Sequence, residues 1–133
     1  LMAAWQSFWR KDGHLAAEGF SYRESGPHLM LMAFLQRIVN GGGRIEREYA
    51  LGRGALDLMI FFGGERIALE VKLRRDTMTG AGAVEQLVSY LEEGGMEEGW
   101  LVIFDLRKEV SWAQKLTLEA VTCEGKRIWV VGC

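Results

Sequence analysis

The sequence predicts a single α/β domain, residues 1–133, in which helices flank one mixed β-sheet that contains a three-stranded meander. The first observation behind this prediction is a pair of apolar runs, 55–62 and 65–73, separated only by two glycines, which is typical of a β-hairpin. The second is that helical and strand-like segments alternate along the chain. The third is size, because 133 residues with 49% hydrophobic content suffice for one core but not for two.

The N-terminal part is expected to be helical. Trp5, Phe8 and Trp9 recur at helical spacing, and Gly13 is expected to end the segment. Residues 1–20 are therefore predicted to form a helical extension of the domain. Its aromatic side chains either cap the core or form a docking face toward a neighbouring domain.

The remaining elements follow from local signals. In order, we expect a helix over 27–39, strands over 44–50, 55–62 and 65–73, a loop over 76–82, a helix over 83–93, a strand over 100–105, a helix over 112–121 and a closing strand over 127–131. Pro27 is suited to a first helical turn, and Ser111 to a helix cap. The continuous apolar run 100–105 predicts a strand that is covered on both faces.

The central hairpin predicts its own register. If the two glycines form the loop, Asp57 lies directly opposite Glu70. Side chains alternate along a strand, so Lys72 shares the face of Glu70. An even residue count in the preceding turn would also bring Glu48 beside Asp57. The opposite face is expected to be apolar and to consist of Leu56, Leu58, Ile60, Ile67, Leu69, Val71 and Leu73.

Two opposed carboxylates need compensation. At about 5 Å they repel each other by roughly 3 kcal/mol at an effective dielectric constant near 20. A divalent cation such as Mg²⁺ or Mn²⁺ can compensate, because these ions take carboxylate oxygens and water as ligands. The ammonium group of Lys72 can also compensate. The first alternative predicts a catalytic site, and the second predicts a structural ion pair on a covered sheet.

Composition limits the classes of partner. A formal net charge of −2 provides no global positive field for nucleic acid, so an anionic substrate would have to be held locally. Cys123 and Cys133 show no spacing typical of a disulfide framework or a zinc site. The apolar runs are too short to span a membrane, and no signal peptide is recognisable. We therefore expect a cytoplasmic protein with no membrane partner.

The central motif resembles that of a known enzyme superfamily. The word GALD, ending at Asp57, is followed after twelve residues by the Glu70-Val71-Lys72 of LEVKL, and this pattern is similar to that of the PD-(D/E)XK nucleases. More closely, the words FLQRIVNGGGRIEREYALGRG, LEVKL, EQLVSYL and GWLVIFD resemble a nuclease-like domain at the C-terminus of certain bacterial AAA-type ATPases. The resemblance covers about residues 24–132. It implies a restriction-endonuclease-like core with the order αβββαβ, followed by a C-terminal helix and strand.

The resemblance also implies roles for individual residues. Asp57 and Glu70 would bind the metal ion, and Lys72 would position the attacking water. Glu24 would add a helix carboxylate to the metal site, although an acid just before a helix is also a common capping residue. Gln86 would help to orient water or phosphate. The chain departs from the superfamily pattern in two places, because no proline precedes Asp57 and Ala55 stands where a basic residue is expected.

Four further residues are candidates for nucleic-acid contact. Arg53, Arg74 and Arg75 flank the ends of the hairpin, where they could contact phosphates or serve only solubility. Tyr90 lies four residues after Gln86 on one helix stripe, and the pair resembles the QxxxY motif of the superfamily. His28 has no acidic or cysteine partner at ligand spacing, and we interpret it as a histidine at a helix start.

Two functions from different classes follow. The first is a Mg²⁺- or Mn²⁺-dependent endo- or exonuclease that acts on nucleic acid, with DNA as the expected substrate. The second is a module that keeps the nuclease fold without turnover and serves nucleic-acid binding or assembly, with Trp5, Trp9 and the acidic surface as contacts. In both cases the resemblance implies an ATPase domain of the parent chain as partner, joined through residues 1–20. The sequence leaves open whether two copies act together as a homodimer.

Overall fold

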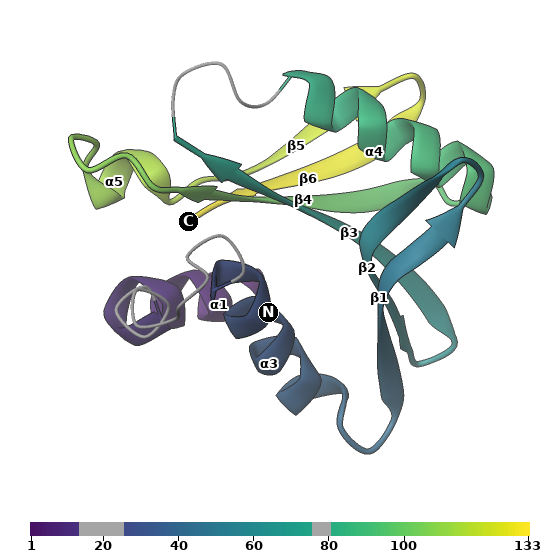
Figure 1. The fold of residues 1–133 in the computed structure, drawn as a ribbon, viewed down its shortest axis with the longest axis horizontal. Coiled ribbons are helices and arrows are strands. Elements are labelled where there is room, and N and C mark those ends of the chain that lie inside the picture. The colour runs from purple at the N-terminus through teal and green to yellow at the C-terminus, as the bar shows by residue number, and fades with distance from the viewer. Residues whose placement is uncertain (14–25, 76–80) are drawn as a thin grey trace.

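A six-stranded mixed sheet lies between two layers of helices (Figure 1). The computed structural model describes residues 1–13, 26–75 and 81–133. The strand order is β1-β2-β3-β4-β6-β5, with β3, β4 and β6 parallel. The strands are β1 (Gly43–Leu51), β2 (Gly54–Phe62), β3 (Glu65–Arg74), β4 (Glu98–Asp105), β5 (Leu118–Cys123) and β6 (Lys126–Gly132). The helices are α1 (Met2–Phe8), η1 (Trp9–Gly13), α3 (Gly26–Val39), α4 (Ala81–Gly94) and α5 (Trp112–Lys115).

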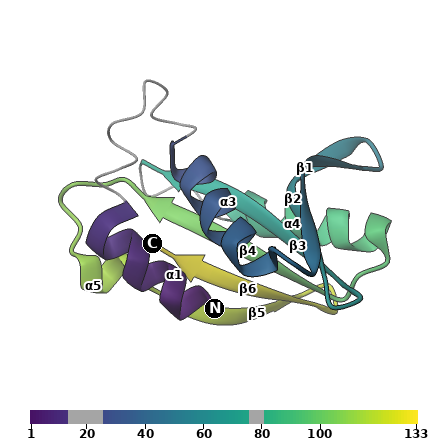
Figure 2. The same cartoon turned by 90° about the horizontal axis from the view of Figure 1, so that it is seen from below.

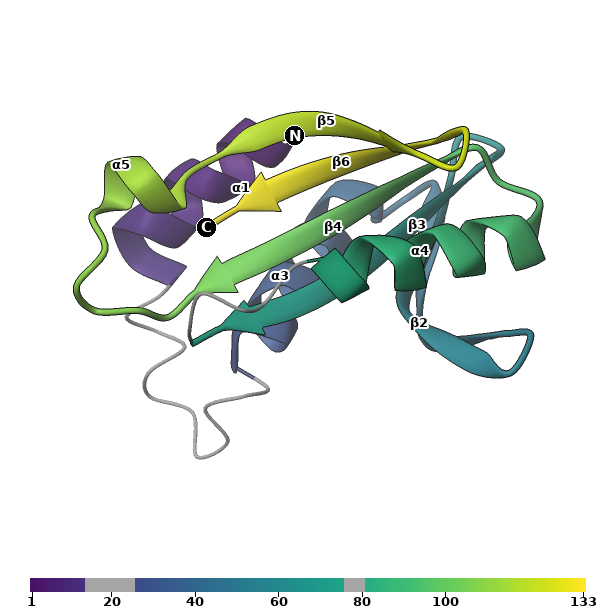
Figure 3. The ribbon, with the colours of Figure 1, turned by 90° about the horizontal axis from the view of Figure 1, so that it is seen from above.

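The predicted register of the hairpin is confirmed. Gly63 and Gly64 have φ values of 60° and 81°, which a type I′ turn requires at both central positions. Phe62 therefore pairs with Glu65, and the ladder continues to the pair Leu58 and Leu69. Beyond that pair, β2 stays with β1 while β3 continues along β4. The two strands diverge from this point, and we call it the fork (Figures 1 and 3).

The sheet is covered on both faces. Helices α1, η1 and α3 pack on one face (Figure 2), and α4 packs on the other (Figure 3). Leu58 and Leu69 belong to the cluster under α1 and α3. The prediction that Leu56 shares their face is wrong, because Leu56 packs in the cluster under α4. Leu56 and Leu58 are two residues apart but lie on opposite faces of the sheet. The alternation of side chains along β2 is therefore interrupted at Asp57.

The aromatic N-terminal helix is part of the core. Trp5 is fully buried, and Trp9 is 3% exposed. The rings of Trp9 and Phe104 meet edge to face, with centroids 4.7 Å apart. The expectation that these aromatics form a docking face is therefore wrong, since they are used to close the α1–α3 side of the sheet. The described part of the segment is helical as far as Gly13, and the rest of the predicted extension, 14–20, lies outside the described residues.

The predicted helix over 112–121 is correct only in its first turn. Ser111 begins α5, and its N–H donates to Gln114 Oε1 at 3.3 Å. The chain then extends as β5, which pairs with β6. Glu124 and Gly125 have φ values of 49° and 77°, so they form a second type I′ turn. The helical expectation missed this hairpin because segment 118–121 is also compatible with helical spacing.

No helix in the described ranges is long and apolar enough to cross a membrane.

A buried ion pair closes the end of β4. The side chain of Asp105 is 5% exposed, and it accepts hydrogen bonds from Arg107 Nε at 2.9 Å and from the Arg107 backbone at 3.1 Å. These hydrogen bonds, chiefly those of the side chain, lower the pKa of Asp105. A carboxylate with a lowered pKa contributes stability above its ordinary pKa, and this contribution is lost as the pH falls through the lowered value.

We predict that Trp5→Ala lowers the free energy of unfolding by about 3–5 kcal/mol, since it empties a fully buried site. The matched control is Leu1→Ala, because Leu1 is 60% exposed and its loss should cost less than about 0.5 kcal/mol. Urea unfolding followed by circular dichroism measures both values. Equal effects of the two substitutions would contradict the position of α1 in the core.

We predict that Asp105→Asn costs about 1.5–3 kcal/mol at pH 7, the range for a hydrogen bond to a charged group. The difference from the native chain should start to shrink below about pH 4, where Asp105 of the unfolded chain becomes protonated, and should continue to shrink as the pH falls toward the lowered pKa of the folded chain. Urea unfolding at pH 7 and pH 3 tests this. The control is Glu119→Gln on exposed β5. Its free energy of unfolding should change with pH in the same way as that of the native chain.

Candidate active site at the fork of the sheet

The carboxylates of Asp57 and Glu70 lie in the opening between β2 and β3. The N–H of Asp57 donates to Glu70 Oε2 at 3.2 Å, and the N–H of Val71 donates to Asp57 Oδ2 at 2.7 Å. Backbone N–H groups point within the plane of a sheet toward the neighbouring strand. Each carboxylate therefore takes a place that a backbone carbonyl of the partner strand would fill in a continuous ladder. The prediction that the two acids lie close together is correct. They fill the gap between the two strands, however, and do not stand side by side on one face of the sheet.

A distortion in β1 accompanies this opening. The β1–β2 loop has two residues, Gly52 and Arg53, and the ladder is interrupted at Glu48 and Asp57, between the pairs Arg47–Leu58 and Tyr49–Leu56. This even loop is the case in which the sequence predicted Glu48 beside Asp57. Glu48 has a φ of 48°, which is uncommon for a residue with a side chain, and it is exposed. The regular pairing of β2 is thus disturbed on both sides of Asp57.

Lys72 connects the fork to α4. Its Nζ lies 3.2 Å from Glu70 Oε1 and donates to Gln86 Oε1 at 3.0 Å. Gln86 Nε2 in turn lies 3.3 Å from the Tyr90 hydroxyl. A row of polar contacts therefore runs from Glu70 through Lys72 and Gln86 to Tyr90, as the shared helix stripe of the last two residues suggested.

The fork is partly open to solvent. The side chain of Glu70 is 3% exposed, whereas those of Asp57 and Lys72 are 27% and 31% exposed. A purely structural ion pair would have Lys72 enclosed between both carboxylates. The observed ion pair joins Lys72 to Glu70, and both Lys72 and Asp57 remain accessible. This arrangement allows a ligand to approach the acids.

The electrostatics of the fork favour a cation. Burial raises the pKa of Glu70, and the nearby charge of Asp57 raises it further. The hydrogen bond from the Asp57 N–H and the contact with Lys72 act in the opposite direction. A buried carboxylate next to a second carboxylate creates a negative potential, which a bound cation would relieve.

His28 is a member of the site that the sequence did not predict. It stands in the first turn of α3, and its Nε2 lies 3.9 Å from Asp57 Oδ2. Burial lowers the pKa of His28 despite the nearby carboxylate, with the charges of Arg47 and Lys72 acting in the same direction. The imidazole is therefore neutral at pH 7. No spacing rule could have found it, because α3 meets β2 only in the folded sheet.

The other residues that the sequence predicted for the site do not all lie together. Glu24 lies outside the described residues. Arg53 and Tyr90 line a hollow of about 390 Å³ beside Gln86. Arg74 and Arg75 follow β3 along the other branch of the fork. The structure therefore brings Arg53 and Tyr90 together but separates them from the other two arginines.

Asp57 and Glu70 fit a hard divalent cation as a ligand pair. Within residues 1–13, 26–75 and 81–133, no group of three or more His, Cys, Asp and Glu side chains is arranged to hold a metal ion. Mg²⁺ is often bound by only one or two carboxylates and completes its shell with water and substrate phosphate. The oxygen-only pair at the fork suits that mode of binding.

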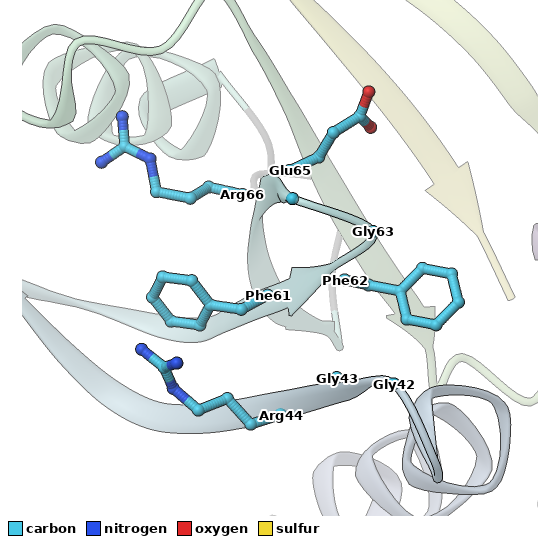
Figure 4. Close-up of a pocket in the computed structure, with 9 residues that line it drawn as sticks. Gly42, Gly43, Arg44, Phe61, Phe62, Gly63, Glu65 and Arg66 are labelled. Carbon is cyan, nitrogen blue, oxygen red and sulfur yellow. The ribbon is translucent and has the colours of Figure 1, made fainter.

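A different hollow lies at the closed end of the hairpin (Figure 4). It has a volume of about 490 Å³ and surrounds the turn at Gly63. The guanidinium of Arg44 stacks on the ring of Phe61, 3.9 Å from its centroid, and Arg66 donates to the carbonyl of Gly94 at 2.8 Å. These cations are engaged in contacts that hold the hairpin, so this hollow is not the candidate site.

The chain belongs to a family described as a domain of unknown function, DUF8371, whose model matches residues 2–108. The match includes both carboxylates of the fork, Lys72, His28 and the Gln86–Tyr90 pair. It ends before β5 and β6. No curated protein matches the chain.

We predict that Glu70→Gln raises the free energy of unfolding in metal-free buffer at pH 7, by up to about 1 kcal/mol, the scale of a cross-strand charge pair. The substitution removes a buried charge that repels Asp57, and the amide oxygen can still accept the Asp57 N–H. Lys72→Met should have the opposite effect, because it removes the cation beside Glu70. Urea unfolding with a chelator measures both, and a loss of stability in Glu70→Gln of more than about 1 kcal/mol would contradict the prediction.

Proposed function

We propose that this domain is a divalent-metal-dependent nuclease that hydrolyses phosphodiester bonds of nucleic acid, with DNA as the expected substrate. The observation that carries the proposal is the fork, where two carboxylates and one ammonium group meet at a partly open break in the sheet. Metal-assisted phosphodiester hydrolysis uses this combination of groups. The resemblance of GALD and LEVKL to the PD-(D/E)XK motif supports the same conclusion independently.

Each residue has a distinct role in this proposal. Asp57 and Glu70 hold Mg²⁺ or Mn²⁺, and the sequence resemblance adds Glu24 as a third carboxylate. The bound ion lowers the pKa of water and neutralises charge on the phosphate. Lys72 keeps its charge, orients the attacking water and stabilises the phosphate oxygens. Gln86 fixes the ammonium group of Lys72 through their 3.0 Å hydrogen bond and is available to phosphate or water.

The wider assignment follows the same reasoning. The forked hairpin between α3 and α4 is compatible with a restriction-endonuclease-like core. Arg53 and Tyr90 on one branch, and Arg74 and Arg75 on the other, are candidates for contacts with the nucleic-acid backbone. We further propose a cytoplasmic setting, on the cysteine pattern of the sequence, and an ATPase domain of the parent chain as partner, on the sequence resemblance alone.

One observation favours a second candidate function. Both oxygens of Glu70 already have partners, since Lys72 lies beside Oε1 and the Asp57 N–H donates to Oε2. A carboxylate engaged in this way must exchange partners before it can bind a metal ion. The alternative is therefore a module that keeps this fold for nucleic-acid binding or assembly with the ATPase, without turnover.

A cleavage assay tests the first function. The domain is incubated with linear, circular and single-stranded DNA and with RNA in Mn²⁺ or Mg²⁺. We expect cleavage of at least one DNA substrate, and we expect Lys72→Ala to lower its rate by about 10²–10³-fold, the range for loss of one electrostatic group in an active site. Cleavage by the native domain that does not exceed that of Lys72→Ala would remove the proposal.

Calorimetry separates the two candidates. A nuclease site should take up Mn²⁺ and lose this uptake in Glu70→Gln, whereas Glu119→Gln on exposed β5 should bind Mn²⁺ as the native chain does. Uptake should also stabilise the fold, by about 2.7 kcal/mol at a free concentration one hundred times the Kd. Binding of the parent ATPase without uptake of metal would favour the assembly module.

A further inference from the structure

The hollow beside Gln86 lies between the β1–β2 loop and the C-terminal half of α4. It has a volume of about 390 Å³ and is lined by Leu51, Arg53, Gly54, Gln86, Ser89, Tyr90 and Glu93. All of these residues lie within the described part of the chain. Gln86 belongs both to this lining and to the polar row that begins at Glu70, so the hollow adjoins the fork directly.

The ring of Tyr90 lines this hollow and packs against β2. Its hydroxyl lies 3.3 Å from Gln86 Nε2, and the ring covers the backbone of β2 at Gly54. A Cβ atom at Gly54 would lie 2.7 Å from the hydroxyl and 2.8 Å from Cε1, so only glycine allows this contact. Tyr90 is half-buried. A fixed, partly exposed aromatic ring next to a phosphodiester-cleaving site can stack with a nucleobase.

The polar groups of the hollow follow one stripe of α4. The stripe contains Gln86, then Ser89 and Tyr90 about one helical turn later, and then Glu93 after another turn. It therefore extends roughly 10 Å away from the fork. Arg53 is exposed at the rim and has no ion pair among the described side chains. A phosphate could meet Arg53, while Glu93 at the far end could accept a hydrogen bond from the amino group of a base.

We propose that this hollow binds one unpaired nucleotide of the strand being cut, so that the domain acts on single-stranded nucleic acid or frayed ends in preference to intact duplex. This inference rests on the proposed nuclease function. A base inside a duplex presents only its edge and must leave the stack before it can lie on Tyr90. An unpaired base has both faces free and enters without that cost. Glu93 further favours the bases that carry an amino group, cytosine, adenine and guanine, over thymine, which has none.

Fluorescence anisotropy tests the preference. Labelled 20-nucleotide oligo-dC, oligo-dT and a mixed-sequence duplex are titrated with the 133-residue chain in Ca²⁺ at one fixed salt concentration, and gels verify that the oligonucleotides remain intact. We expect oligo-dC to bind more tightly than the duplex and more tightly than oligo-dT. Glu93→Gln should reduce the difference between oligo-dC and oligo-dT. Equal binding of oligo-dC and duplex would overturn the proposal.

Variants of the hollow provide the matched comparison. Tyr90→Leu should weaken oligo-dC binding by roughly 5- to 100-fold, the range for loss of one stacking contact, while Tyr90→Phe keeps the ring and should change it less than threefold. Ser89→Leu fills the hollow from an exposed helix position and should weaken oligo-dC binding without affecting duplex binding. Arg53→Gln should reduce the salt dependence by about one charge. Tyr90→Leu and Ser89→Leu variants that bind oligo-dC like the native chain would overturn the proposal.

The two proposals fail in different ways. If the native chain cleaves DNA but the hollow variants bind oligo-dC normally, the nuclease function stands and the nucleotide site is removed. If oligo-dC binding depends on Tyr90 and Ser89 but no nucleic acid is cleaved in Mn²⁺, the site stands and the nuclease function is removed.

Discussion

The structure of the candidate site depends on one exchange of hydrogen bonds. Where β2 and β3 part, the N–H of Asp57 donates to the carboxylate of Glu70, and the N–H of Val71 donates to the carboxylate of Asp57. These side-chain oxygens replace two backbone carbonyls, so both strands keep their N–H groups satisfied while they diverge. The opening is thus stabilised by the residues that we propose as metal ligands. Truncation of either side chain to alanine would leave a backbone N–H at the fork without its partner.

This arrangement has an electrostatic cost. Glu70 is almost completely buried next to a second acid, and its pKa is raised by burial and by Asp57. Lys72 offsets part of the cost from the α4 side. Groups with perturbed pKa values in an accessible gap are common at functional sites, although structural ion pairs can show them too. The partial exposure of Asp57 and Lys72 favours the functional interpretation, because a ligand can reach both of them.

The helical layers complete the site from opposite faces of the sheet. From one face, α3 brings His28 close to Asp57. From the other, α4 brings Gln86 to Lys72 and Tyr90 to the backbone of Gly54. The sheet is open between β2 and β3 at this point, so His28 lies near Asp57 itself, and Gln86 is joined to Glu70 through Lys72. The hollow beside Gln86 has the same origin, because β2 separates from β3 and lies beneath the C-terminal half of α4.

The sequence by itself determined the local structure of the hairpin and the identity of its charged residues. Two adjacent glycines between two apolar runs favour a two-residue turn, because both tolerate the positive φ that it requires, and such a turn aligns Asp57 with Glu70. Helical spacing likewise found α3 and α4, whereas over 118–121 it was compatible with helix and strand alike, so the β5–β6 hairpin was missed. Only the tertiary structure decided that the acids fill a gap between strands, that Trp5 and Trp9 close the core, and that His28 reaches the site. Periodicity describes which side of an element is apolar, but the place where two strands separate depends on which neighbour each strand pairs with, and that choice is made by the whole sheet.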